Sequence, residues 1–110
     1  MHKTLLPDGW PRPKGYANGV VAQGDSIIFC GGQIGWTSDE QFEHHDFVGQ
    51  VRQALENVVA VLASADAGPE HITRMTWYVT NREQYMEDLA AVGRAYRDVI
   101  GKHFPAMSVV

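Results

Sequence analysis

Few side chains in this 110-residue sequence have both the type and the spacing needed for catalysis. His44 and His45 are adjacent, so their side chains diverge, and they lack the four-residue spacing of two zinc ligands on a helix. A solvated charged loop before a helix is the simpler interpretation. Cys30 has no neighbouring base in the sequence, and we expect a buried structural thiol there. No Ser-His-Asp arrangement can be identified from spacing, and no metal is expected.

The glycine-rich run from Gly31 to Gly35 has a superficial similarity to a phosphate-binding loop. Neither a helix start nor a Lys-Ser or Lys-Thr pair follows it, so we reject a nucleotide site. Trp10 and Trp36 are expected in loops, where a large aromatic side chain often marks an interface or the rim of a pocket. Trp77 is expected in the core or in an interface.

Composition and charge exclude several classes of protein. Hydrophobic residues make up 45% of the chain and charged residues 20%, as in an ordinary globular protein, and we expect a single domain over residues 1–110. The net charge of −4 opposes nucleic-acid binding, which depends on a basic surface. No apolar run approaches the ~18 residues of a membrane span, and the first residues lack the apolar core of a signal peptide. With one cysteine and no internal disulfide, a cytoplasmic protein is expected.

The elements that must position any site begin with a turn-rich first third. Pro11 and Pro13 bias their predecessors to extended geometry and exclude a helix there. Residues 20–23 and 26–30 are two β-prone runs separated by Gly24-Asp25, and this pattern predicts a β-hairpin.

Helical periodicity predicts two helices with a strand between them. Residues 46–67 carry one apolar stripe, with Asp46 as the N-cap and Gly68-Pro69 as the stop. Residues 72–80 alternate as a strand with one packed face does. The alternation places Met75, Trp77 and Val79 on one face and Arg74, Thr76 and Tyr78 on the other. Thr80 and Glu83 form a capping box for the second helix, which is expected to end at Gly101.

Residues 107–110 begin a further strand, so the expected order is β-β-α-β-α-β. Helices with one apolar stripe and strands with one packed face predict an α+β fold, a two-layer sandwich. The sequence stops as its last strand begins, and we expect a complete fold to continue that strand beyond Val110.

Several short segments, in order and with matching spacing, resemble the RidA (YjgF) family over about residues 7 to 110. They are Gly15-Tyr16-Ala17, Gly32-Gln33-Ile34, Gln50-x-x-Gln53-x-Leu55-x-Asn57, Ala67-Gly68 ahead of Trp77-Tyr78-Val79, and Phe104-Pro105-Ala106. The resemblance implies a chorismate-mutase-like fold and a homotrimer with ligand clefts between subunits. It also implies hydrolysis of reactive enamines and imines to keto acids and ammonia, without a metal or organic cofactor. Members of the family are also described as translation inhibitors or endoribonucleases.

The sequence departs from that family where the substrate is held. In the deaminase members an arginine follows the Pro-Ala of the last loop and binds the substrate carboxylate, and here that position is Met107. A hydrogen bond to a charged group contributes about 1.5–3 kcal/mol net, which a methionine does not supply. The family's serine before Gly-Gln is Gly31 here.

The residues that match the family's site imply the following roles. Tyr16 is the expected catalytic residue, because its hydroxyl can bond a carbonyl or position a water molecule. The expected ligand-binding residues are Gly31, Gly32, Gln33, Met107, Val109 and Arg12. Met107 and Val109 would make the pocket apolar, and Arg12 or Lys14 would restore a cation for an anionic ligand.

Three functions remain open at this point. The first is an enamine or imine deaminase, or a related hydrolase, of a subgroup without the family's arginine. The second is a noncatalytic trimer that binds a metabolite or regulates another protein. The third, an RNA-directed translation inhibitor or endoribonuclease, is opposed by the charge of −4 and the lack of a basic cluster.

Overall fold

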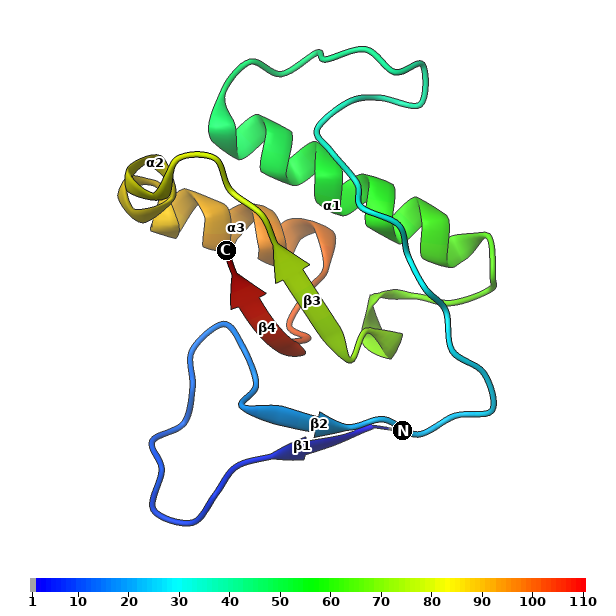
Figure 1. Ribbon diagram of the computed structural model, residues 1–110, viewed down its shortest axis with the longest axis vertical. Helices are drawn as coiled ribbons and strands as arrows, with labels where there is room; N and C mark the ends of the chain where they lie inside the picture. The colour runs from blue at the N-terminus through cyan, green and yellow to red at the C-terminus, as the bar shows by residue number, and fades with distance from the viewer. Residues whose placement is uncertain (1) are drawn as a thin grey trace.

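Two helices pack on one face of a parallel strand pair in the computed structural model, which describes residues 2–110 (Figure 1). The elements in chain order are β1 (Lys3–Leu5), β2 (Gly19–Val21), α1 (Phe47–Ala63), the 3-10 turn η1 (Pro69–His71), β3 (Arg74–Trp77), α2 (Arg82–Glu87), α3 (Leu89–Val99) and β4 (Ala106–Val109). The α+β class with two layers is confirmed.

The long helix α1 begins where the sequence predicts and ends four residues early. The Asp46 carboxylate accepts a hydrogen bond from the Gly49 backbone N–H at 2.9 Å, as an N-cap does. Asp66 has a φ of 57°, and the Ala67 N–H donates back to the Leu62 carbonyl at 3.0 Å. This left-handed turn satisfies a terminal carbonyl and ends the helix before the expected Gly68-Pro69 stop.

The second predicted helix forms as two pieces, and the proposed Thr80 capping box is wrong. Asn81 is the N-cap of α2, and its side-chain oxygen accepts from the Gln84 N–H at 3.0 Å. Asparagine ranks above threonine as an N-cap, which accounts for the shift by one residue. A break at Asp88 separates α2 from α3, and Gly101, with a φ of 91°, follows the end of α3 as expected.

The strands β3 and β4 pair in parallel, with Met75 opposite Met107 and Trp77 opposite Val109. Met75 and Trp77 are half-buried while Arg74 and Thr76 are exposed, so the predicted packing of one strand face is confirmed. The packed face meets a buried cluster of Leu55, Tyr96 and Ile100 from α1 and the end of α3.

Tyr96 connects this cluster to the loop before β4. Its hydroxyl donates to the His103 carbonyl, and His103 Nε2 lies 2.7 Å from the Ile72 carbonyl oxygen. Burial disfavours the phenolate and raises the pKa of Tyr96 above its ordinary value of 10.0. The start of β4 is therefore tied both to α3 and to the residue that precedes β3 by two positions.

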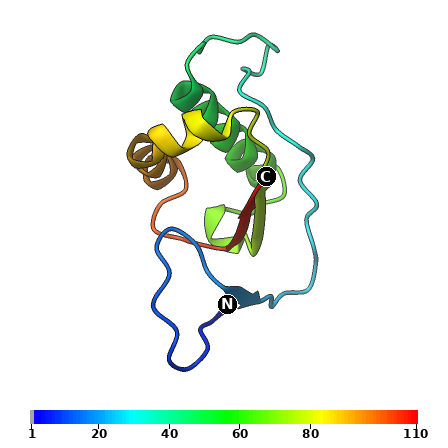
Figure 2. The ribbon, with the colours of Figure 1, turned by 60° about the vertical axis from the view of Figure 1, so that its left-hand side comes forward.

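The predicted hairpin of residues 20–23 and 26–30 is wrong within one chain. Instead, β2 pairs antiparallel with β1, with Lys3 opposite Val21 and Leu5 opposite Gly19. After a bend at Gly24-Asp25 the chain runs on toward α1 rather than reversing along β2 (Figure 2). We call residues 22–34 the crossing segment.

Almost all of the crossing segment lies open to solvent. Every residue from 21 to 32 is exposed, including Ile27 at 79% and Phe29 at 89%. Cys30 is exposed as well, so the expectation of a buried thiol is wrong. The reason is the missing hairpin, because a strand with no neighbour covers neither its own side chains nor those beside it.

Candidate functional site

Tyr16 is held beside the start of β4 by the backbone of the residue that follows it. The Ala17 N–H donates to the Pro105 carbonyl at 2.9 Å, and Ala17 forms an isolated parallel bridge with Ala106. Both Ala17 and Pro105 are buried. Tyr16 and Met107 are each one residue from this bridge, so the two positions lie at the same end of β4.

Met107 itself packs inward. Its side chain is half-buried against the Leu55, Tyr96 and Ile100 cluster, whereas Val109 is exposed and pairs with Trp77. The surroundings of Met107 are therefore apolar, as expected for this position, while its contact with a ligand stays a prediction.

An aromatic cluster lines the packed side of β3 and β4. The ring centroids of Trp77 lie 6.4 Å from those of Tyr85 and Tyr96, and Tyr96 stacks on Phe104 at 5.6 Å. The Trp77 indole N–H is the buried side-chain donor that finds no hydrogen-bond acceptor within residues 2–110. A buried donor without an acceptor is costly, so this nitrogen lowers the stability of the packed layer.

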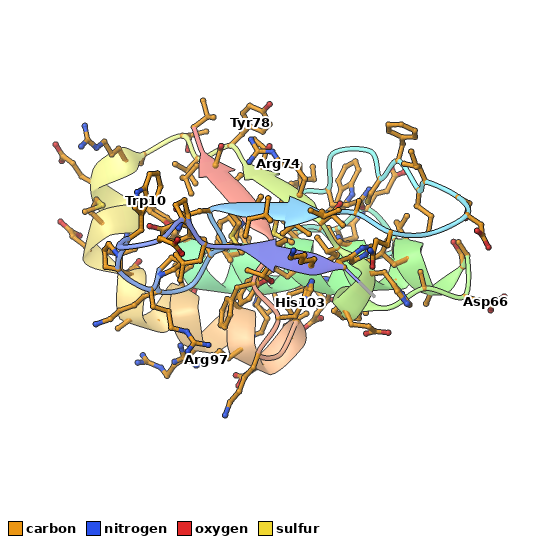
Figure 3. All side chains as sticks on the ribbon, turned by 90° about the horizontal axis from the view of Figure 1, so that it is seen from below. Trp10, Asp66, Arg74, Tyr78, Arg97 and His103 are labelled. Carbon is orange, nitrogen blue, oxygen red and sulfur yellow. The ribbon has the colours of Figure 1, made fainter. Side chains whose placement is uncertain are left out.

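The opposite face of the same strands carries Arg74, a cation that the sequence alone does not identify as a site residue. Arg74 Nη2 donates to Ser108 Oγ at 2.8 Å, and Arg74 makes no ion pair in the described part of the chain. Figure 3 shows Arg74 and Tyr78 projecting from the same side of β3. Strand alternation already grouped Arg74, Thr76 and Tyr78 on one face, and that grouping was the signal available. A guanidinium in this state can bind a carboxylate through two parallel hydrogen bonds.

Arg12 lies in the exposed loop between β1 and β2, where residues 2–110 provide it with no ionic partner. Tyr16, four residues later, is 45% exposed. The structure thus leaves Arg12 accessible in the middle of the loop that delivers Tyr16 to β4, and its role as a ligand cation stays a prediction.

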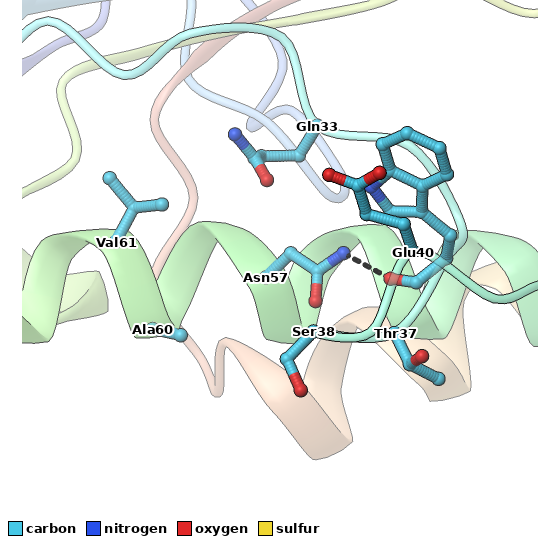
Figure 4. A pocket seen from close by; sticks show the side chains of 8 residues that line it. Gln33, Thr37, Ser38, Glu40, Asn57, Ala60 and Val61 are labelled. Carbon is cyan, nitrogen blue, oxygen red and sulfur yellow. Dashed lines mark hydrogen bonds between the residues drawn. The ribbon is translucent and has the colours of Figure 1, made fainter.

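The glycines and Gln33 fall in a different place from Tyr16. Gly31 and Gly32 are exposed on the crossing segment, and Gln33 lines a shallow pocket of about 260 Å³ against α1 (Figure 4). The pocket is lined by Gln33, Trp36, Thr37, Ser38, Glu40, Asn57, Ala60 and Val61. Within one chain, Tyr16 and Met107 therefore lie at the start of β4, whereas Gln33 lies against α1.

Asn57 on α1 connects the helix to the segment that forms the other wall of this pocket. Its side-chain N–H groups donate to the carbonyls of Ile34 at 3.0 Å and Trp36 at 2.7 Å, and its oxygen accepts from Gln53. Figure 4 shows the bond that reaches the Trp36 carbonyl. Trp36 in turn lies 5.8 Å from Phe42, centroid to centroid. Asn57 thus anchors the end of the crossing segment on α1.

The described residues contain neither a metal-binding cluster nor a membrane-spanning helix. Within residues 2–110, no three His, Cys, Asp or Glu side chains come together as a metal site would require. No helix in this range has the length and apolar character needed to cross a bilayer.

Comparison with known proteins places these features in context. The model of the family "Endoribonuclease L-PSP" matches residues 11–110. The 2-iminobutanoate/2-iminopropanoate deaminase of Salmonella typhimurium is 31% identical over 114 aligned positions, covering 100% of this chain and 84% of that protein. The RutC family protein UK114 of Drosophila melanogaster is 32% identical over 94 residues, covering 84% of this chain and 64% of that protein, so the chain spans less than two thirds of this relative.

Solved structures show the same fold. The Rid family protein YyfB of Yersinia pestis superposes with a TM-score of 0.84 at 24% identity, covering 99% of this chain and 85% of that one. E. coli TdcF with bound serine superposes with a TM-score of 0.65 at 28% identity, covering 98% and 84%. At nearly equal coverage, the chain follows the arrangement of YyfB more closely than that of TdcF.

Proposed function

The chain belongs to the endoribonuclease L-PSP family, which includes the RidA-type proteins, and from this premise we propose that it hydrolyses small enamines or imines, or a related conjugated compound. The Salmonella relative named as an imine deaminase, 31% identical across the whole chain, supports this reaction class. The chain would represent a subgroup without the carboxylate-binding arginine, since Met107 occupies that position.

The observation that carries the proposal is the bridge between Ala17 and Ala106. It places Tyr16 beside the Pro105-Ala106-Met107 start of β4, although the two segments lie at opposite ends of the sequence. The Tyr16 hydroxyl would bond the substrate or hold a water molecule against the C=N carbon. The water oxygen bonds to that carbon as the second C–N bond opens, and one water proton passes to nitrogen to give a carbinolamine. The hydroxyl proton of the carbinolamine then passes to nitrogen, and the remaining C–N bond breaks to leave a C=O group and ammonia. An enamine first becomes the imine by gaining a proton at its β-carbon and losing one from nitrogen.

The remaining parts of the site come from the family resemblance. In a homotrimer, Gly31, Gly32 and Gln33 of a neighbouring subunit would complete the cleft, with backbone N–H groups orienting the water. A substrate carboxylate would then need a cation other than residue 107. Arg12 on the loop before Tyr16, and Arg74, whose strand partner Ala106 is also the bridge partner of Ala17, are the two candidates.

The test is ammonia release from freshly generated imines of neutral, aromatic and acidic amino acids. We expect turnover by the parent and a loss of about 100-fold or more in Tyr16→Phe, the scale on which a positioned acid–base group contributes. Tyr78→Phe is the matched control, because Tyr78 is exposed and follows the end of β3 that lies away from Ala106, and it should keep the parent's rate. Equal rates for the parent and Tyr16→Phe on every processed substrate would contradict the role of Tyr16.

Substitution of the two candidate arginines tests which of them binds the carboxylate of an anionic substrate. Whichever of Arg12→Gln and Arg74→Gln raises the KM for acidic imines identifies the cation that binds the carboxylate. If neither variant changes KM, the substrate has no carboxylate that either arginine binds.

The packing of Met107 against the core favours a second candidate, a noncatalytic trimer that binds a metabolite. An inward side chain without charge leaves this end of β4 without the group that anchors substrates in the family's deaminases. In that case the parent would release no ammonia from any imine, whereas Met107→Arg would. RNA binding remains opposed by the net charge of −4, and salt-sensitive RNA binding by nuclease-free protein would overturn that view.

A further inference from the structure

Part of the crossing segment has the sequence of a β-strand but has no hydrogen-bonded neighbour in the described residues. Residues 26–30 read Ser-Ile-Ile-Phe-Cys, a β-branched and aromatic run, directly after the two-residue turn signal Gly24-Asp25. Yet within residues 2–110 no backbone–backbone hydrogen bond involves residues 24–33. A long, apolar, unpaired strand is a template for pairing with another chain.

A matching vacant edge lies on β2 of the same chain. One edge of Gly19–Val21 is occupied by β1, and the described residues leave the other edge unpaired. A two-residue turn at Gly24-Asp25 sets Gln23 opposite Ser26 and Val20 opposite Phe29. The chain therefore contains two segments that could form one antiparallel pair, β2 and residues 26–30, but they do not pair with each other in the described structure.

The exposed area is larger than a chain of this size normally presents. A folded monomer of 12.2 kDa exposes about 6,100 Å², whereas this chain exposes 7831 Å². The excess, roughly 1,700 Å², exceeds the ~800 Å² that each partner buries in a standard protein interface. Residues 21–32 contribute to this excess along their whole length, because every one of them is exposed.

We propose that residues 26–30 of one copy pair antiparallel with the vacant edge of β2 in a second copy. The register is the one that Gly24-Asp25 encodes, and the bend at these two residues is the hinge of a strand exchange. The strand that fills the vacant edge of β2 comes from another copy of this chain. The reason is that the same sequence contains both the complementary strand and the turn residues that determine its register. The exchange closes between two copies or around a ring, and in either case it carries Gly31, Gly32 and Gln33 toward the neighbouring copy.

Disulfide trapping between chains tests the exchange directly. Val20 and Phe29 form a non-hydrogen-bonded pair in this register, with Cα atoms about 4.5 Å apart, which a disulfide can span. In a Cys30→Ser background, a chain with Val20→Cys and a tagged chain with Phe29→Cys are unfolded together, refolded and oxidised. We expect a mixed two-chain species on a nonreducing gel.

A matched control uses the pair that the structure places within one chain. Thr4 is opposite Val20 in the β1–β2 register, so a mixture of Thr4→Cys and Val20→Cys chains should give no mixed species. The Thr4→Cys/Val20→Cys double variant should cross-link internally. If the Val20 and Phe29 mixture gives no mixed species and the Val20→Cys/Phe29→Cys double variant cross-links within one chain, the hairpin is intramolecular and the proposal is overturned.

Association provides an independent readout. Phe29→Asp places a charge on a side chain that is 89% exposed, so the helical signal by circular dichroism should be unchanged. Light scattering during gel filtration should show the association constant reduced by at least ~10-fold, the effect of about 1.4 kcal/mol. Tyr78→Asp, a change at another exposed aromatic, should leave association unaltered. A parent chain that is monomeric at every concentration, or an oligomer that Phe29→Asp does not weaken, would overturn the exchange, and the second result would still allow the trimer invoked for the hydrolase.

Discussion

The helical layer and the crossing segment differ in how far their apolar side chains are buried. Leu55, Tyr96 and Ile100 are buried against one another behind β3 and β4, whereas Ile27 and Phe29 face solvent. A helix with an apolar stripe needs only a surface to lie on, and α1, α3 and the strand pair provide one another with such surfaces. A strand needs a hydrogen-bonded neighbour as well, and within one chain residues 26–30 have none.

The largest expected difference between the two regions is in the cost of truncation. Leu55→Ala leaves a cavity in the buried cluster and should lower the free energy of unfolding by about 2–5 kcal/mol at every protein concentration. Phe29→Ala should change it by no more than about 0.5 kcal/mol in the dilute monomer, because the side chain is exposed. Urea unfolding across a range of concentrations measures both, and a large concentration-independent cost for Phe29→Ala would contradict the comparison.

Asn57 connects α1, in the helical layer, to the end of the crossing segment, and its substitution should weaken this contact. Asn57→Ala eliminates two donors to the carbonyls of Ile34 and Trp36, at a cost of about 1–3 kcal/mol. Hydrogen exchange of residues 34–37 should accelerate. Asn81→Ala is the control, since it removes the α2 cap for about 1 kcal/mol but should leave exchange in residues 34–37 unchanged.

Tyr96 tests how the packed layer responds to pH. Burial raises the pKa of Tyr96, so the neutral phenol is favoured by folding. This contribution to stability is complete below the unfolded pKa of about 10 and is lost as pH rises through the folded value. We expect Tyr96→Phe to cost about 0.5–1.5 kcal/mol at pH 7 through the bond to His103.

The same variant should lose less stability than the parent between pH 9 and pH 11. Urea midpoints at the two pH values give the comparison. Equal losses in the parent and Tyr96→Phe would show that the phenol is not held neutral by its surroundings.

The smallest effect is expected at the ion pair that connects α1 to α3. Arg52 Nη2 lies 2.9 Å from Asp98 Oδ2, with 37% and 61% of the two side chains exposed. Exposed pairs contribute about 0.2–1 kcal/mol and are screened by salt. Asp98→Asn should therefore lower stability by less than Leu55→Ala does on the same α1–α3 contact, and the loss should shrink in 1 M salt. A loss that persists in high salt would contradict a screened pair.

The parts of the fold predicted correctly from the sequence are those specified by local signals. The apolar stripe of residues 46–67, the Asp46 cap and the alternation around Trp77 depend on residues within a few positions of one another. The end of α1 was misplaced because the left-handed Asp66 gives no strong signal in the sequence. The hairpin failed for a different reason. Gly24-Asp25 predicts a turn, but a local turn signal does not determine whether the two runs beside it pair with each other.

The candidate site was only partly predictable. Phe104-Pro105-Ala106 and Gly15-Tyr16-Ala17 were identified by resemblance, and the structure joins them through Ala17 and Ala106. Strand alternation predicts the face of β3 on which Arg74 lies, but it does not predict that this cation lies beside β4, because that proximity depends on the parallel register with Ala106. No periodicity within a single segment encodes that register.

The bridge between Ala17 and Ala106 also bears on the order of folding. It closes a loop of nearly the whole chain, and contacts between residues so distant in sequence form slowly because chain entropy must first be lost. The helices and the three buried residues of their cluster all come from residues 47–100, so Tyr16 should reach β4 only in a late step.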